Sequence, residues 1–280
     1  ILLVGAAGRV DTVAEQFDSV RFQHRNPARP EFYIIVGSYK GKDVAAMSVG
    51  IGTDNVEIAV NELHALFEYD HVLDTWSKEK PNVNIIRVGT CGTPHVKIPV
   101  GAFAISTHGL GLDNLGAFYP FPEQNPRASA IENAFRGTSV GKVNSLAYAS
   151  TATPHVVDKL REVAMNAGEG GVAVSVGITL AAPGFNAPEG RQIGRLKTAF
   201  TYDEFVEATQ AFQCEGLSIV NFEMETSALF RLGHEQLGYA VGAICVVMDN
   251  LATDEFIDAD KAAERMRQCI HIALEAIITL

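Results

Sequence analysis

The sequence predicts an α/β fold: a single-domain, three-layer α/β/α sandwich around a twisted, mixed and mostly parallel central sheet. Short apolar runs typical of strands alternate with segments of helical periodicity. A turn at Lys40–Gly41 joins two of these runs into a hairpin, so part of the sheet is antiparallel. No repeat, linker or low-complexity tract interrupts the 280 residues, which favours one domain over 1–280.

The expected elements follow from where each periodic run begins and ends. Strands are apolar runs bounded by glycine, asparagine or proline, and they are predicted at residues 1–4, 33–38, 43–49, 84–88, 102–107, 142–149, 172–176, 219–220 and 239–248. Helices have apolar residues at three- and four-residue spacing. The first is predicted to follow a turn at residues 5–9 and to end at about Phe17, and the others to span 56–69, 154–167, 202–214, 223–236 and 259–278. Loops are predicted at 24–30, 109–127 and 182–194, and a polar excursion at 70–82.

Composition limits the partners. Lys and Arg number 22 against 33 Asp and Glu, a net charge of −11 that repels polyanions, so we expect no nucleic-acid or anionic membrane partner. Four scattered cysteines form no C-x-x-C pair and indicate reduced thiols, hence a cytoplasmic protein. The histidines show no metal-binding spacing, so we expect no metal site. No apolar run is long enough to span a membrane.

Arg87 is out of place in its apolar strand, 84–88. Burying a guanidinium costs several kcal/mol unless an anion or carboxylate meets it. The segment that follows supplies backbone N–H groups at Gly89 and Gly92 and hydroxyls at Thr90 and Thr93, all suited to oxyanions. Two interpretations stay open: a bound phosphate-sized anion, or a structural carboxylate that pairs with Arg87.

Ligands of open α/β sheets lie beyond the carboxyl ends of the strands. Loops at these ends are expected to bring together Arg9, Thr53, Thr90, Phe185 with Arg191, Glu223-Met224-Glu225, and Asp249. Acidic residues in the first turn of a helix also stabilise its dipole, so Glu223 and Glu225 have a structural explanation as well. Glu225 with Met224 otherwise suits a sugar, the carboxylate accepting from a diol and the thioether packing on the ring.

In order along the chain, several segments together resemble the nucleoside phosphorylase family of the phosphorylase/hydrolase superfold, most closely the uridine phosphorylases. They are Gly5 with Arg9-Val10, Ser48–Gly52, Ile58–Leu63, Arg87–Gly92, Phe185 with Gly190-Arg191, and Phe222–Glu225.

The resemblance implies a role for each matching residue. Phosphate would be bound by Gly5, Arg9, Arg87 and Thr90, and Arg25 would reach the phosphate of a neighbouring subunit in a dimer or larger homo-oligomer. The ribose would be held by Thr90, Glu223, Met224 and Glu225, and the base by Phe185, Glu189 and Arg191. Arg87, Thr90 and Arg191 would be catalytic, with inorganic phosphate as co-substrate and no cofactor. The family's N-terminal histidine, which contacts the ribose 5′-hydroxyl, has no counterpart, so residues are expected before Ile1.

Three departures concern the base and the first loop. Glu189 stands where the family has glutamine, and an ionised carboxylate there would repel a uracil carbonyl unless it is protonated or turned to Arg191. Asp249 stands where purine nucleoside phosphorylases keep a general acid, although it is also explained as a loop or cap residue. Ala6-Ala7 replaces an acid and a proline. The main hypothesis is phosphorolysis of a pyrimidine nucleoside. The alternatives are a purine nucleoside phosphorylase or nucleoside hydrolase, and a non-catalytic nucleoside-binding homologue.

Overall fold

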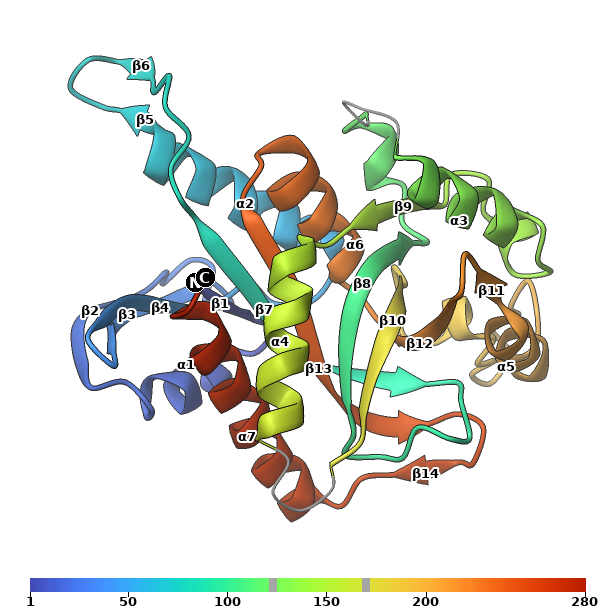
Figure 1. The fold of residues 1–280 in the computed structure, drawn as a ribbon. Helices are drawn as coiled ribbons and strands as arrows, with labels where there is room; N and C mark the ends of the chain where they lie inside the picture. The colour runs from blue at the N-terminus through green and yellow to red at the C-terminus, as the bar shows by residue number, and fades with distance from the viewer. Residues whose placement is uncertain (121–124, 168–171) are drawn as a thin grey trace.

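A computed structural model describes residues 1–120, 125–167 and 172–280, which form one α/β unit built on a large mixed sheet (Figure 1). Its strands are β1 (Leu2–Val4), β2 (Ser19–Arg25), β3 (Tyr33–Tyr39), β4 (Lys42–Ser48), β7 (Asn84–Thr93), β8 (Phe103–Gly111), β9 (Tyr148–Thr151), β10 (Val174–Ala181), β11 (Gln213–Cys214), β12 (Leu217–Glu223), β13 (Ala240–Asn250) and β14 (Glu255–Phe256).

The helices are α1 (Ala7–Ala14), α2 (Thr53–Glu68), α3 (Pro126–Arg136), α4 (Pro154–Asn166), α5 (Tyr202–Ala211), α6 (Thr226–Leu229) and α7 (Ala259–Ile277). A π-helix, Phe230–Gln236, continues α6, and short 3-10 turns occur at Leu115–Ala117, Gly141–Val143 and Ala187–Glu189.

The strand order is β11-β12-β10-β8-β13-β7-β1-β4-β3-β2. Parallel pairs join the central strands, from β13 through β7 and β1 to β4 and from β8 through β10 to β12, whereas β8 pairs antiparallel with β13. Phe222 of β12 also pairs with Gly92 of β7, which closes five strands into a ring. The mixed sheet confirms the predicted fold class, and the pairing of Phe222 with Gly92 brings the carboxyl ends of β12 and β7 together.

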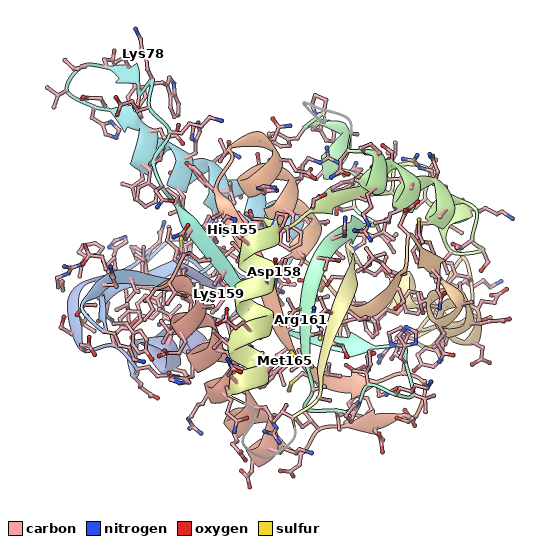
Figure 2. All side chains as sticks on the ribbon, viewed as in Figure 1. Lys78, His155, Asp158, Lys159, Arg161 and Met165 are labelled. Carbon is pink, nitrogen blue, oxygen red and sulfur yellow. The ribbon has the colours of Figure 1, made fainter. Side chains whose placement is uncertain are left out.

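Helices cover both faces of the sheet. In Figure 1, α4 and α7 lie in front of β7 and β13, with α2 and α6 behind. Figure 2 shows the outward side of α4, which carries His155, Asp158, Lys159, Arg161 and Met165. Its other side buries Val156, Val157 and Leu160 in the main core, so the helix is amphipathic at the expected spacing.

The structure differs from the predicted elements in three places. Residues 89–93 were expected to be a loop, but they continue β7 because β13 pairs with them as far as Thr93. The predicted strand over 142–149 is instead a 3-10 turn followed by β9. β2 was missed because every residue in it is exposed, so no apolar pattern marks this edge strand.

The two segments without an assigned role are only partly loops. The excursion over 70–82 begins as a small hairpin of β5 (Tyr69–Asp70) and β6 (Thr75–Trp76) that projects from the body beyond α2 (Figure 1). The predicted loop 109–127 contains the end of β8, a 3-10 turn and the start of α3, and its residues 121–124 lie outside the described part of the chain.

Candidate active site

A cleft of about 650 Å³ lies at the carboxyl ends of the central strands. Loops after β1 and β4, the outer part of β7, and the ends of β12 and β13 supply most of its walls, together with the segment after β10. Of the site residues predicted from the sequence, it brings together Gly5, Arg9, Arg87, Thr90, Phe185, Glu189, Glu223, Met224 and Glu225. Arg25 and Arg191 are not among the residues that line it.

Arg87 is held by two carboxylates at the floor of the cleft. Its Nε donates to Glu223 Oε2 at 2.8 Å, and its Nη2 donates to Glu225 Oε2. The side chain of Arg87 is only 6% exposed, so the two carboxylates supply the countercharge that burial requires. Of the two interpretations of Arg87, the pairing with a structural carboxylate is therefore present, and two carboxylates take part in it.

Backbone donors complete the hydrogen bonds of both carboxylates. Glu225 N–H and Thr226 N–H donate to Glu223, at 3.1 and 2.9 Å, which caps the start of α6. Gly52 N–H donates to Glu225 Oε1 at 2.7 Å, so the turn before α2 is tied to the same cluster. The position of Arg87 on β7 is therefore fixed by β12, by the start of α6 and by the turn before α2.

The local glycine is a steric requirement. A Cβ on Gly89 would lie 2.5 Å from Arg87 Nη1 and 2.8 Å from Cys245 Sγ. Burial lowers the pKa of Arg87, but the charges of Glu225 and Glu223 outweigh it and raise the pKa above its ordinary value. Burial raises the pKa of Glu223, and Arg87 opposes that rise. The guanidinium stays charged, and its Nη1 has no acceptor among the described residues.

The first loop adds a second guanidinium and a helix terminus. Arg9 donates from Nη1 to the carbonyl of Val88 at 3.2 Å, which places its head beside Arg87. Burial, and after it the positive charge of Arg87, lowers the pKa of Arg9. Ala6 caps α1 without a side-chain hydrogen bond, and the N–H of Arg9 donates to the Ala6 carbonyl at 3.0 Å. The N–H groups of Ala7 and Gly8 are left available to an anion in the cleft.

At the other end, Glu189 and Asp249 line the cleft and Arg191 lies against both of them. Arg191 Nη2 donates to Asp249 Oδ2 at 3.2 Å, and Arg191 Nε lies 2.9 Å from Glu189 Oε2. Gly190 makes this approach possible, since its φ is +70° and a Cβ there would lie 2.3 Å from the carbonyl oxygen of Thr201.

Asp249 is the clearest difference from expectation at this end. It was interpreted chiefly as a loop or cap residue, but it belongs to β13, is 8% exposed and faces the cleft. Burial raises the pKa of Asp249 and, to about 7, the pKa of Glu189, although Arg191 opposes both shifts.

Aromatic and apolar side chains complete this end. The Arg191 guanidinium lies 5.3 Å from the ring centre of Phe185, which is 58% exposed and lines the cleft. Ile51 and Phe256 also line it and are largely exposed. Sequence patterns missed Phe256 because β14 is only two residues long. An aromatic face beside hydrogen-bonding groups suits a planar heterocycle.

Arg25 lies on the edge strand β2, with its guanidinium 4.9 Å from the ring centre of Tyr33. It makes no contribution to the cleft of its own chain. In the described part of the chain, no group of three or more His, Cys, Asp or Glu side chains is arranged to hold a metal ion. Nor is any helix there long and apolar enough to cross a membrane.

Comparison with known proteins defines the class. The model of the phosphorylase superfamily matches residues 1–279, so the chain belongs to that superfamily. It is 27% identical over 280 residues to a uridine phosphorylase of Thermococcus kodakarensis, covering 99% of this chain and 80% of the relative. It is 24% identical to a guanosine phosphorylase of Halorubrum lacusprofundi, covering 100% of this chain and 92% of that protein.

Among solved structures, a Trypanosoma brucei nucleoside phosphorylase with uridine phosphorylase activity superimposes with a TM-score of 0.90 and 31% identity, covering 100% of this chain and 93% of that one. The chain is therefore an enzyme of the nucleoside phosphorylase kind, a pentosyltransferase.

Proposed function

We propose that the protein catalyses phosphorolysis of uridine or a related pyrimidine nucleoside, giving the free base and ribose 1-phosphate. The observation that carries the proposal is the two-ended cleft. One end offers Arg9, Arg87, Thr90 and the first turn of α1 to an anion, and the other offers Phe185 to a planar base. The likeness to uridine phosphorylases supports the choice of base.

The proposed reaction places phosphate at the arginine end and the ribose over Met224 and Glu225. A phosphate oxygen attacks C1′ as the bond between C1′ and the base nitrogen breaks, and the bonding electrons leave with the base. Holding both reactants in one cleft makes the attack effectively intramolecular. The sugar becomes oxocarbenium-like, and the adjacent phosphate is the nearest stabilising charge. No covalent enzyme intermediate is needed, and we propose that phosphate is the co-substrate and that no cofactor takes part.

Charge balance argues for a further cation at the phosphate end. Arg9 and Arg87 supply two positive charges, and Glu223 and Glu225 offset both of them. A phosphate dianion in a buried setting needs additional countercharge. We propose that Arg25 of a second subunit supplies it, so that the active form is a homo-oligomer working in the cytoplasm.

The decisive test is release of uracil from uridine with and without phosphate. We expect release only with phosphate, with ribose 1-phosphate formed in equal amount. Release that is independent of phosphate would identify a nucleoside hydrolase instead. Calorimetric binding of uridine with no turnover at any phosphate concentration would identify a nucleoside-binding protein that does no chemistry.

A purine nucleoside is the second candidate, because Asp249 faces the cleft where an acid could protonate a leaving purine. The likeness to a guanosine phosphorylase also favours it. A panel of uridine, inosine, guanosine and adenosine separates the candidates. Turnover of a purine nucleoside above that of uridine, lost in Asp249→Asn, would establish the purine activity.

A further inference from the structure

Among the described residues, two carboxyl groups and no guanidinium line the base end of the cleft. Glu189 and Asp249 line it and are 3% and 8% exposed, whereas Arg191 does not line it and borders a separate surface hollow with Tyr202. A base that enters the cleft therefore meets carboxyl oxygens first. An ionised carboxylate can only accept hydrogen bonds, so it repels a carbonyl oxygen.

The charges around this pair do not balance if both acids are ionised. One guanidinium would then face two carboxylates, leaving one uncompensated negative charge in a buried setting. The other titratable groups at this end are Tyr202, whose ring centre lies 5.8 Å from the Arg191 guanidinium, and Asp254, whose charge raises the pKa of Tyr202 after the larger effect of burial. Neither supplies a positive charge.

Hydrogen-bond geometry distinguishes the two acids. Asp249 Oδ2 accepts a hydrogen bond from Arg191 Nη2. Glu189 Oε2 and Arg191 Nε are 2.9 Å apart, but neither of these buried atoms has a hydrogen-bond partner among the described residues. Glu189 Oε2 is thus the carboxyl oxygen without a hydrogen bond, although Glu189 is the more buried of the two acids.

Resting on the proposed function, we propose that Glu189 binds the base in its protonated form and donates a hydrogen bond from its carboxyl O–H to a carbonyl oxygen of the base. Asp249 stays ionised as the partner of Arg191, and the cluster of Glu189, Arg191 and Asp249 is then neutral. Donation to the carbonyl also stabilises the negative charge that the base acquires as it leaves.

The proton makes Glu189 the residue that selects the base. Burial and the neighbouring Asp249, opposed by Arg191, hold the pKa of Glu189 at about 7. Below that pH the carboxyl donates to a carbonyl, as uracil requires. Above it the carboxylate accepts only, which suits an exocyclic amino group or a ring N–H. Preference is therefore expected to move from carbonyl-bearing to amino-bearing bases as the pH rises.

The test is the kcat/KM of the unmodified protein for uridine divided by that of Glu189→Gln, measured from about pH 5.5 to 8.5. Glutamine keeps an N–H donor at every pH, and titration of phosphate and of the nucleoside affects both proteins equally, so it cancels in the ratio. We expect a constant ratio below about pH 7 and a fall approaching about tenfold per pH unit above it. A ratio that does not change with pH would overturn the proposal.

Glu235→Gln is the matched control. Glu235 is also buried with a pKa of about 7, and its Oε2 lies 3.3 Å from Arg231 Nε, but it is outside the cleft. Its ratio is expected to stay constant across the pH range. A fall like that of Glu189→Gln would show a general effect of buried glutamates and would also overturn the proposal.

Binding of uracil tests the proton directly and does not depend on turnover. Calorimetry at about pH 8 in two buffers of different ionisation enthalpy is expected to show uptake of close to one proton by the unmodified protein and none by Glu189→Gln. Absence of uptake overturns the proposal even if uridine is a substrate. Uptake without any phosphorolysis would instead support the role of Glu189 and refute the proposed function.

Discussion

The cleft contains two clusters of one arginine between two carboxyl groups, and they differ in how completely hydrogen bonds satisfy them. In the first, Glu223 and Glu225 accept from Arg87 and also from three backbone N–H groups. In the second, no backbone N–H in the described residues donates to the carboxyl group of Glu189 or Asp249, and Arg191 Nε is left without an acceptor.

The difference follows from which part of the backbone lies beside each cluster. The first cluster lies at the start of α6, where unpaired N–H groups point at the carboxylates, whereas the second lies between a strand end and a 3-10 turn. A cluster whose hydrogen bonds are all made holds its groups in fixed positions. A cluster with unmade hydrogen bonds can still bind a ligand, and one of its acids can gain or lose a proton. We infer that the first positions the sugar and phosphate, and that the second recognises the base.

Arg87→Ala should give the largest effect. It leaves Glu223 and Glu225 buried without their partner, so the free energy of unfolding is expected to fall by about 3–5 kcal/mol in denaturant titration. If the folded variant is assayed, kcat/KM for phosphate should fall by at least about 100-fold, since a buried hydrogen-bonded charge is lost. Unchanged phosphate dependence would remove Arg87 from the phosphate site and leave it a purely structural role.

Mixing two defective variants tests the missing countercharge of the first cluster. Arg25→Ala and Arg87→Ala are each expected to be nearly inactive. If Arg25 completes the site of its neighbour, a hybrid dimer carries one intact site, and co-expression at equal levels should recover about a quarter of the normal activity. Activity no higher than the sum of the two variants would show that Arg25 acts within its own chain or not at all.

The sequence predicts those parts of the fold and of the site in which residue types form a recognisable pattern. Arg87 was recognisable as an arginine inside an apolar strand, and the choice between an anion and a carboxylate could not be made because Glu223 lies 136 residues away. The neighbours of Arg87 were identified through the Gly-Thr and Glu-Met-Glu segments. The fold class followed from alternating strands and helices, but β2 has no apolar side chain that is buried and so gave no signal.

The second cluster was harder to predict. Glu189 was noticed only as a departure from a family pattern, and Asp249 also through its place after a strand. Their shared contact with Arg191 depends on a left-handed glycine and on β13 extending to Asn250. That Arg191 contacts both acids is a result of packing that no spacing in the chain predicts.

Arg191→Ala should affect the base and spare the phosphate. The side chain of Arg191 is 21% exposed, so water can partly replace it as a partner of the two acids. Its loss therefore costs less stability than the loss of the buried Arg87. We expect kcat/KM for uridine to fall by about tenfold, the effect of one charged hydrogen bond, with the KM for phosphate changed by less than about twofold. An equal change in both constants would mean that the two clusters do not act separately. Arg195→Ala, four residues further along an exposed loop, is the control.

The remaining effect concerns stability and pH. The pKa of Glu189 is raised from 4.5 to about 7 by folding, so the folded protein binds this proton more tightly than the unfolded chain. Stability that depends on the proton is present below about pH 4.5 and is lost as the pH rises through about 7. Glu189→Gln carries no such charge, and its free energy of unfolding relative to the unmodified protein should therefore improve by about 2–3 kcal/mol between pH 5 and 8.

Glu235→Gln should show the same trend, because the pKa of Glu235 is also raised to about 7 by burial. The two variants then agree in stability and differ in turnover, since only Glu189 faces the cleft. A relative stability of Glu189→Gln that is the same at both pH values would mean that Glu189 is ionised throughout. The second cluster would then be as fixed as the first, and base selection would have to come from Phe185 and the shape of the cleft.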